Sequence, residues 1–140
     1  MSKTINAPLK YVFDWCTDFR EDDPKLTNSK SRRIILDKTK KQAVYATIYT
    51  GADGKEKIGV DVVTLKSPNS WHLESFGEED LETGDYRLVS MGKNKTKLNM
   101  VFKEKWKIEK APTVEEAVES TSRVWDQYAQ ALEKDYSARQ

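Results

Sequence analysis

Residues 95–134 read KTKLNMVFKEKWKIEKAPTVEEAVESTSRVWDQYAQALEK, and the hydrophobic period changes within this stretch. In residues 95–108, apolar side chains mostly occupy even positions and lysines most odd ones, which predicts a strand with one buried face. From residue 113 the spacing becomes helical, and the T-x-x-E pattern of residues 113–116 is a capping box that marks a helix start. A helix of about 24 residues is roughly 36 Å long, so it can cross a sheet and cover one face.

The predicted helix has an apolar stripe that would face the sheet. Most of the charged side chains in this segment lie on its other side. The stripe consists of Val114, Ala117, Val118, Thr121, Val124, Trp125, Tyr128, Ala131 and Leu132.

The sequence upstream predicts an antiparallel sheet. Segments 31–38, 42–50, 57–65, 70–76 and 82–91 are rich in β-branched and aromatic residues, and turn residues separate them. Their links are too short for a parallel crossover, which takes a dozen residues or more, so neighbouring strands are antiparallel. With residues 95–108, these segments predict a meander of about six strands.

The N-terminal residues predict a short strand followed by helices. Residues 2–5 are a possible first strand, whose pairing partner the sequence leaves open. Pro8 opens a helix, because the first helical position tolerates proline, and a break at residues 22–24 leads into a second short helix. The buried face of the first helix consists of Leu9, Val12, Phe13 and Cys16, the last as a small apolar filler.

Turn signals predict how the strands pair. We expect a three-residue turn at residues 92–94, two-residue turns at 53–54 and 67–68, and pairing of Gly77 with Asp80. The resulting pairs are Leu88 with Leu98, Tyr86 with Met100, Glu82 with Glu104, Tyr49 with Ile58, Thr47 with Val60, Tyr45 with Val62, Thr64 with Trp71, Val62 with Leu73, and Trp71 with Tyr86. Directly opposite residues share a face of the sheet.

The predicted inner face is unusual for a dry core. It carries tyrosines, small hydroxyl groups and glutamate, whereas a dry core favours Leu, Ile and Val, and buried hydroxyls and carboxylates need partners. An aromatic surface with a few polar groups is typical of a small-molecule pocket. The face consists of Tyr45, Thr47, Tyr49, Val60, Val62, Trp71, Leu73, Ser75, Tyr86, Leu88, Leu98, Met100, Phe102 and Glu104.

Composition excludes several classes of protein. The 140 residues carry a net charge of +1, which argues against a polybasic or acidic tail, and a hydrophobic fraction of 37% is too high for a disordered chain. No apolar run approaches the roughly 20 residues of a membrane span, and the N-terminus lacks the features of a signal peptide. We therefore expect one domain, residues 1–140, in a soluble cytoplasmic protein without stable membrane insertion.

The chemistry available to the chain is also narrow. One His and one Cys exclude most zinc sites and any internal disulfide. The chain has neither of the common glycine-rich phosphate loops and no G-x-S-x-G elbow. We expect no metal and no cofactor, so any catalysis would depend on carboxylates, tyrosines or water.

Residues 5–15, INAPLKYVFDW, with Thr17-Asp18-Phe19 and the amphipathic final helix, resemble the START-like helix-grip (SRPBCC) superfamily. Its polyketide cyclase/dehydrase and plant pathogenesis-related branches are the most similar, and the resemblance covers nearly the whole chain. It implies an α+β helix-grip fold, in which a curved antiparallel sheet of six or seven strands wraps around the long C-terminal helix. Two short helices would follow the first strand, and a deep cavity would lie between sheet and final helix.

Three functions follow from this resemblance. Members typically bind lipids, sterols, polyketides or other apolar molecules; some catalyse cyclisation or dehydration, and some activate the ATPase of a heat-shock chaperone. We expect binding of a small hydrophobic or amphipathic molecule, with a cyclase/dehydrase and a protein-interaction module as alternatives. The expected ligand-binding residues are Tyr45, Thr47, Tyr49, Val62, Trp71, Leu73, Tyr86, Leu88, Leu98, Met100, Phe102, Glu104, Trp125 and Tyr128. The competing interpretation is a filled core of bulky rings.

Charged side chains allow further interpretations. Glu82 and Glu104 facing one another would form an acid/base pair, since close like charges raise one pKa; alternatively both lie in water or pair with a basic residue. His72 is expected to point outward beside Glu74 and to be solvated. The lysines of residues 95–107, with Arg87, and the basic residues of 30–33 favour a solvated face over nucleic-acid binding, because no aromatic residues are interleaved with the outward lysines.

Overall fold

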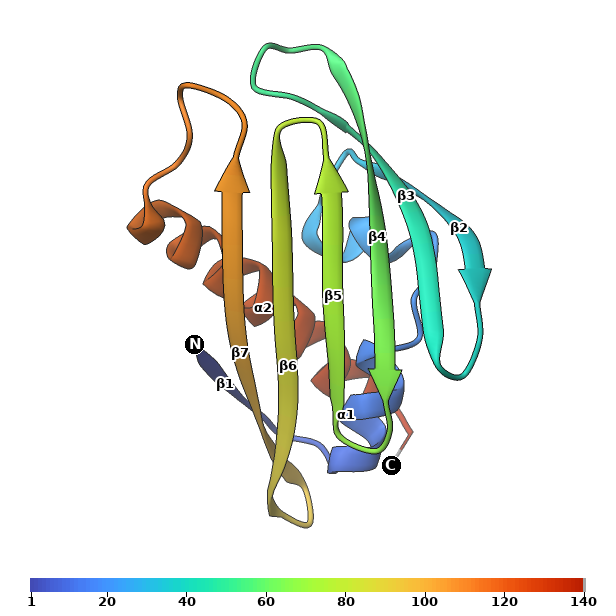
Figure 1. The fold of residues 1–140 in the computed structure, drawn as a ribbon. Coiled ribbons are helices and arrows are strands. Elements are labelled where there is room, and N and C mark those ends of the chain that lie inside the picture. Colours follow the sequence, from blue (N-terminus) through green and yellow to red (C-terminus); the bar gives the residue numbers. More distant parts are fainter. Residues whose placement is uncertain (140) are drawn as a thin grey trace.

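A curved antiparallel sheet holds a long helix against its concave face in the computed structural model, which describes residues 1–139 (Figure 1). The strands are β1 (Ser2–Ile5), β2 (Arg32–Lys38), β3 (Gln42–Thr50), β4 (Glu56–Lys66), β5 (Ser70–Gly77), β6 (Asp80–Gly92) and β7 (Lys95–Trp106). The helices are α1 (Leu9–Cys16), the 3-10 helix η1 (Asp23–Thr27) and α2 (Val114–Ser137). The predicted α+β helix-grip arrangement is confirmed. Among the described helices, none combines the length and apolar character that a membrane span requires.

The sheet order is β1-β7-β6-β5-β4-β3-β2, so the first strand lies beside the last. This identifies the partner of β1 that the sequence left open. Ser2 lies opposite Asn99 and Ile5 opposite Thr96, and the amine of Met1 donates a hydrogen bond to the carbonyl oxygen of Met100 at 3.1 Å. The sheet therefore has β1 and β2 as its two edges.

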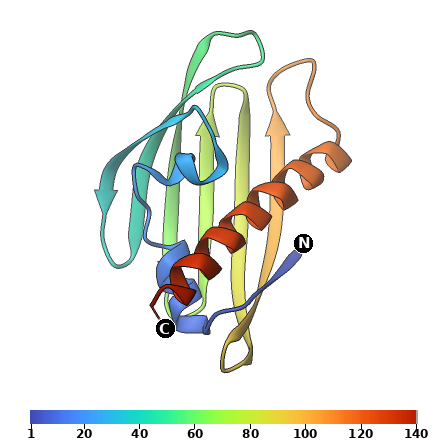
Figure 2. The same cartoon turned by 180° about the vertical axis from the view of Figure 1, so that it is seen from behind.

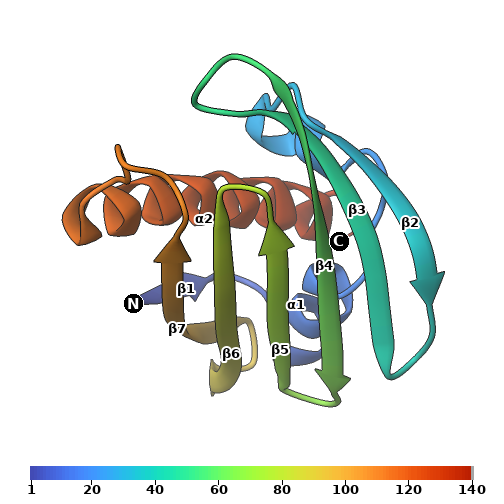
Figure 3. The same ribbon diagram turned by 45° about the horizontal axis from the view of Figure 1, so that its top comes forward.

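Helix α2 crosses the concave face diagonally (Figure 2). Its capping box is present, with the Thr113 hydroxyl accepting from the Glu116 amide and the Glu116 carboxylate accepting from the Thr113 amide, both at 3.1 Å. Leu132 in its C-terminal half is fully buried. The first turns extend past β7 (Figure 3), which leaves Val114 80% and Val118 50% exposed. The prediction that the whole stripe is buried was therefore wrong for these two valines, because the helix is longer than the sheet beneath it.

The predicted register of the β6–β7 hairpin is confirmed. Leu88 lies opposite Leu98, Tyr86 opposite Met100 and Glu82 opposite Glu104. Gly92 pairs with Lys95, so the turn itself is one residue shorter than expected. The extra residue lies in an irregularity between Ser90 and Gly92, and the strands beyond it therefore pair as predicted. The even positions of β7 face the concave side, as predicted.

Strand β4 is turned over relative to the prediction. Tyr45 lies opposite Asp61 instead of Val62, and Leu73 lies opposite Val63 instead of Val62. Val63 is accordingly 1% exposed, while Val60 and Val62 lie on the convex face. A shift of one residue in each hairpin causes this, since the period of a strand is two and every side chain changes face.

Both hairpin links next to β4 are longer than the two residues expected. In the first, the Gly51 amide bonds to the Lys55 carbonyl at 2.8 Å, so residues 52–54 form the turn, and Gly54 adopts a positive φ of 78°. In the second, Asn69 belongs to the turn, and its carbonyl accepts from the amide of Leu88 at 2.7 Å. The pairing of Trp71 with Tyr86 on β5 and β6 is as predicted.

Candidate functional site

A cavity of about 260 Å³ lies between the concave face and α2. The side chains that line it come from every helix and strand except β1. The cavity is lined by Trp15, Cys16, Phe19, Asp23, Leu26, Arg33, Tyr45, Val63, Trp71, Leu73, Glu82, Tyr86, Phe102, Ser120, Thr121, Val124, Trp125 and Tyr128. The space under the helix is therefore not filled by the core.

A wider groove of about 650 Å³ continues from the cavity under the N-terminal half of α2. The two spaces share Glu82, Phe102, Ser120 and Thr121, so they adjoin. The groove ends near Trp106 and the start of the helix. The overhanging turns of α2 thus form the roof of an open route to the cavity.

The expected ligand-binding residues divide into five groups in the structure. Tyr45, Trp71, Leu73, Tyr86, Phe102, Trp125 and Tyr128 line the cavity, and Glu104 lines the groove. Leu88, Leu98 and Met100 are at most 1% exposed and belong to the core next to α1. Thr47 and Tyr49 share the concave side with Tyr45 but are not among the lining residues. Val62 faces away, because β4 is turned over.

Aromatic rings form a continuous wall around Tyr86. Its ring is stacked on that of Trp71, with centroids 4.9 Å apart and planes 10° apart. The ring of Phe102 is nearly perpendicular to that of Tyr86, with planes 82° and centroids 5.5 Å apart, and the centroid of the Trp125 ring of α2 lies 5.6 Å away. Trp125 in turn contacts Tyr128 at 5.2 Å. Gly84 makes this close packing possible, since a Cβ there would lie 3.1 Å from both Phe102 and Tyr86.

The opposite wall contains a nearly buried ion pair. The Arg33 guanidinium of β2 contacts the Asp23 carboxylate of η1 at 2.7 Å, and these side chains are 12% and 15% exposed. The same guanidinium lies over the ring of Tyr45, 4.1 Å from its centroid. Sequence analysis placed Arg33 only in a solvated basic cluster and missed this pair, because the contact joins two elements whose relative position no local pattern defines.

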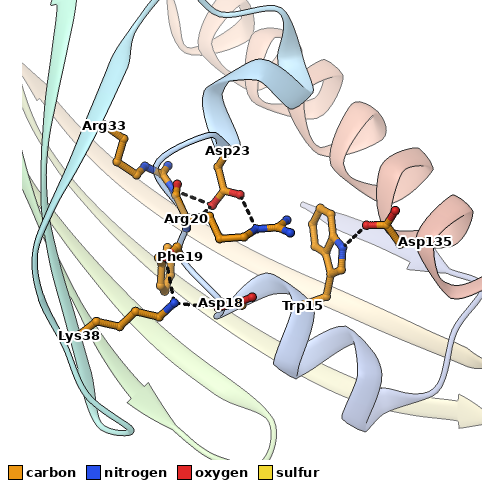
Figure 4. A network of polar contacts seen from close by, with 8 residues as sticks. All are labelled: Trp15, Asp18, Phe19, Arg20, Asp23, Arg33, Lys38 and Asp135. Atoms are coloured by element: carbon orange, nitrogen blue, oxygen red, sulfur yellow. Dashed lines mark hydrogen bonds and ion pairs between the residues drawn. The ribbon is translucent and has the colours of Figure 1, made fainter.

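Further polar contacts fix the segment between α1 and β2 over the cavity (Figure 4). Arg20 and Arg33 both converge on Asp23. Lys38 of β2 contacts Asp18 at 2.7 Å. At the other side, the indole nitrogen of Trp15 donates to Asp135 of α2 at 2.9 Å. These bonds connect α1, η1, β2 and α2 around one end of the cavity.

A group of carboxyls lies where cavity and groove meet. Carboxylate oxygens of Asp80, Glu82 and Glu104 are within 4.8 Å of one another, a group of oxygen ligands of the kind that hard cations prefer. Burial, the hydrogen bond to Asp80 and the charge of Glu82 raise the pKa of Glu104 to about 8. Burial also raises the pKa of Glu82. The predicted facing of Glu82 and Glu104 is confirmed, and Asp80 is a third member that sequence analysis missed.

Asp61 is a further carboxyl that the sequence did not place inside. It replaces Val62 opposite Tyr45 on the concave side. Burial raises its pKa, while hydrogen bonding by Ser75 and Tyr45 and the charge of Arg33 oppose that shift. Burial likewise raises the pKa of the Tyr45 hydroxyl. The concave face is thus more acidic than the sequence predicted.

Two reactive side chains have environments that the sequence anticipated in part. Cys16 lines the cavity, and burial raises the pKa of its thiol, which fits an apolar filler. His72 points to the convex side with Glu74, as expected. Its Nδ1 lies 2.6 Å from the Asp85 carboxylate, and this hydrogen bond raises its pKa. The expectation of a merely solvated histidine was therefore incomplete.

The raised pKa of Glu104 makes the stability of the fold decrease as the pH rises. Folding raises the pKa of Glu104 from 4.5 to about 8, so the folded chain binds this proton more tightly than the unfolded chain. The stabilisation that this proton provides is fully present below the pKa of Glu104 in the unfolded chain, 4.5. It is lost as the pH rises through the pKa of the folded chain, about 8. We expect urea midpoints to decrease from about pH 5 to about pH 9, and Glu104→Gln to decrease less. An equal decrease in Glu104→Gln would contradict this assignment.

No protein-family model matches the chain, and no curated protein sequence matches it significantly. Solved structures do. A START superfamily protein from Mycobacterium smegmatis superposes with a TM-score of 0.71 at 17% identity, over 100% of this chain and 98% of that one. The Zhui aromatase/cyclase of a Streptomyces species gives 0.71 at 12% identity, over 99% and 92%.

The di-domain ARO/CYC protein StfQ of the steffimycin biosynthetic pathway gives a TM-score of 0.75 at 13% identity. The match covers 99% of this chain and 46% of StfQ, so the chain spans about half of that protein. At these identities the similarity establishes the fold alone. The chain has the START-like helix-grip fold.

Proposed function

We propose that the chain binds a small, largely apolar, ring-bearing molecule in the cavity beneath α2. The observation that carries this proposal is the space of about 260 Å³ walled by aromatic rings, with Tyr86 at their centre. In a filled core, rings of this size would pack against one another and leave no such space. Flat apolar ligands gain from stacking and edge contacts with rings as well as from leaving water.

The size and access of the site support this proposal. Binding pockets are commonly about 300–1,000 Å³ and mostly apolar with a few polar groups. The cavity alone is slightly smaller than that range, and the adjoining groove of about 650 Å³ provides entry and room for a substituent. The names of Zhui, an aromatase/cyclase, and of the ARO/CYC protein StfQ are consistent with ring-shaped ligands for this fold.

Filling the cavity is expected to weaken this binding strongly. Thr121 lines both cavity and groove, so Thr121→Phe places a ring in the shared space. We expect it to weaken binding of a neutral fluorescent probe, N-phenylnaphthylamine, at least about tenfold, measured by fluorescence titration. Gln127→Phe is the matched control, because Gln127 is exposed on the same helix, and it should bind like the parent. Equal probe affinity in Thr121→Phe and the parent would reject the cavity as the site.

A second candidate function is dehydration of a β-hydroxy ketone. The facing of Glu82 and Glu104, with a pKa of about 8 for Glu104, favours it. A carboxylate on Glu82 would accept the proton from the carbon next to the ketone. The protonated Glu104 would donate a proton to the departing hydroxyl, so the products are an enone and water. General acid–base catalysis of this kind contributes about 10²–10⁴-fold.

The dehydration has a direct assay. The aldol adduct of benzaldehyde and acetone loses water to give benzylideneacetone, which absorbs in the near ultraviolet. We expect Glu104→Gln to reduce turnover about 100-fold while probe affinity stays within about twofold, and Glu115→Gln, on the exposed side of α2, to change neither. If the parent protein gives no turnover above buffer, this second function is rejected and the binding function stands.

A further inference from the structure

The acidic side chains of the site indicate the charge of its ligand. Glu82 lines both cavity and groove, so it lies where they join. Asp80 and Glu104 are its carboxyl neighbours. Within residues 1–139, no Lys, Arg or His side chain lies within salt-bridge distance of these three groups. The negative charge of this group is therefore not paired with a basic side chain of the protein.

Three cations in this part of the molecule have other partners. Arg33, the one basic side chain lining the cavity, is paired with Asp23 at 2.7 Å. The amine of Met1, at the groove, donates to the Met100 carbonyl at 3.1 Å. Lys3 contacts Asp126 at 2.7 Å on the outer side of α2. None of these compensates the carboxyls at the junction.

The entrance of the groove is also acidic. Among the described residues, Arg123 and the Met1 amine are the basic groups that line it, whereas Glu82, Glu116 and Glu119 line it as acids and Glu104 adds a fourth carboxyl group. Anions approaching through this groove meet excess negative charge, and cations are attracted. Asp61 behind Tyr45 adds a further carboxyl on the concave side.

The rings beside these carboxyls suit the same kind of ligand. Phe102 lines both spaces together with Glu82, and its ring contacts Tyr86, whose pKa is raised by burial and by the charge of Glu82. Trp125 completes the cluster from the helix side. The faces of aromatic rings attract ammonium groups, most strongly where water is excluded.

We propose that the ligand of this site is a small ring-bearing amine, bound as its ammonium ion beside Glu82. The apolar part occupies the cavity, and the ammonium group lies against the rings of Phe102 and Trp125 at the junction with the groove. This inference rests on the proposed binding function and specifies its ligand class. It distinguishes the site from one selective for fatty acids or other carboxylates.

Three probes with one skeleton test the proposal: naphthylmethylamine, naphthylmethanol and naphthoate. Each is titrated at neutral pH against N-phenylnaphthylamine bound to the full chain, so that displacement reports affinity. We expect the ammonium to bind about tenfold more tightly than the alcohol, and the carboxylate to bind most weakly. A carboxylate that binds as tightly as the ammonium overturns the proposal.

Variants show whether the carboxyls cause the preference. Glu82→Gln is expected to reduce the ammonium-to-alcohol preference to less than about threefold, because it removes the carboxylate beside the ammonium, whereas Glu104, whose pKa is about 8, is largely protonated at neutral pH. Glu115→Gln, exposed on α2 and outside the groove, should leave it at about tenfold. An unchanged preference in Glu82→Gln, with folding verified by circular dichroism, overturns the proposal.

The two proposals fail in different ways. If the neutral alcohol binds, and Thr121→Phe abolishes its binding, then the cavity is a binding site whatever the charge preference. If the ammonium then binds no better than this alcohol, the proposal that the ligand is an amine is rejected and the binding function is kept. If none of the three probes binds and N-phenylnaphthylamine does not bind either, the binding function itself is rejected.

Discussion

Leu132→Ala is expected to lower the free energy of unfolding by about 3 kcal/mol. Leu132 is 0% exposed and, with Ala129, joins the C-terminal half of α2 to the core. Truncation removes the apolar contacts and leaves a cavity, and such changes cost about 2–5 kcal/mol. Urea denaturation monitored by circular dichroism measures the effect.

The same helix provides a matched control. Val114 is 80% exposed on the part of α2 that extends past the sheet, so Val114→Ala should change stability by less than about 0.5 kcal/mol. A loss below about 1 kcal/mol for Leu132→Ala would mean that α2 is not anchored there. The roof of the cavity would then have another position.

Asp23→Asn is expected to destabilise the chain by about 3 kcal/mol. The Arg33 guanidinium is 12% exposed and depends on this carboxylate at 2.7 Å for its countercharge. Loss of one partner leaves an uncompensated charge in a nearly buried position, which costs far more than the net value of the pair. Urea denaturation at neutral pH is again the measurement.

An exposed ion pair on the same segment is the control. Asp18 and Lys38 also meet at 2.7 Å, but their side chains are 56% and 39% exposed. Asp18→Asn should therefore cost less than about 1 kcal/mol, because water replaces the lost partner. If Asp18→Asn and Asp23→Asn lower the free energy of unfolding equally, burial of the Arg33–Asp23 pair does not explain the loss.

Local patterns predicted most of the sheet and failed at one strand. The alternation in β7 and the capping box of α2 depend on neighbours in sequence, so both were recognised correctly. The face of β4 depended on the lengths of two turns, and each contains one residue more than expected. The two shifts cancel between β3 and β5, which is why Tyr45 and Leu73 were nevertheless placed on the same face.

The candidate site was predicted where it lies on strands and missed where it depends on tertiary docking. Tyr86, Phe102 and Trp125 were identified from periodicity. Arg33 and Asp23 were not, because their pairing requires η1 to lie over β2, and no short motif determines that position. Asp61 was missed because the predicted register of β4 was shifted by one residue. Its place between Val60 and Val62 was a signal, since this alternation does not determine which face of the strand is buried.

The most direct test of a guest site under α2 is an NMR measurement of contacts between ligand and protein. With naphthylmethanol at saturation, we predict intermolecular nuclear Overhauser effects from the naphthyl protons to the indoles of Trp71 on β5 and Trp125 on α2, which both line the cavity. The same effects should be absent in Thr121→Phe. Saturable binding with contacts only to convex-face residues such as Phe76, and none to these two indoles, would contradict the account.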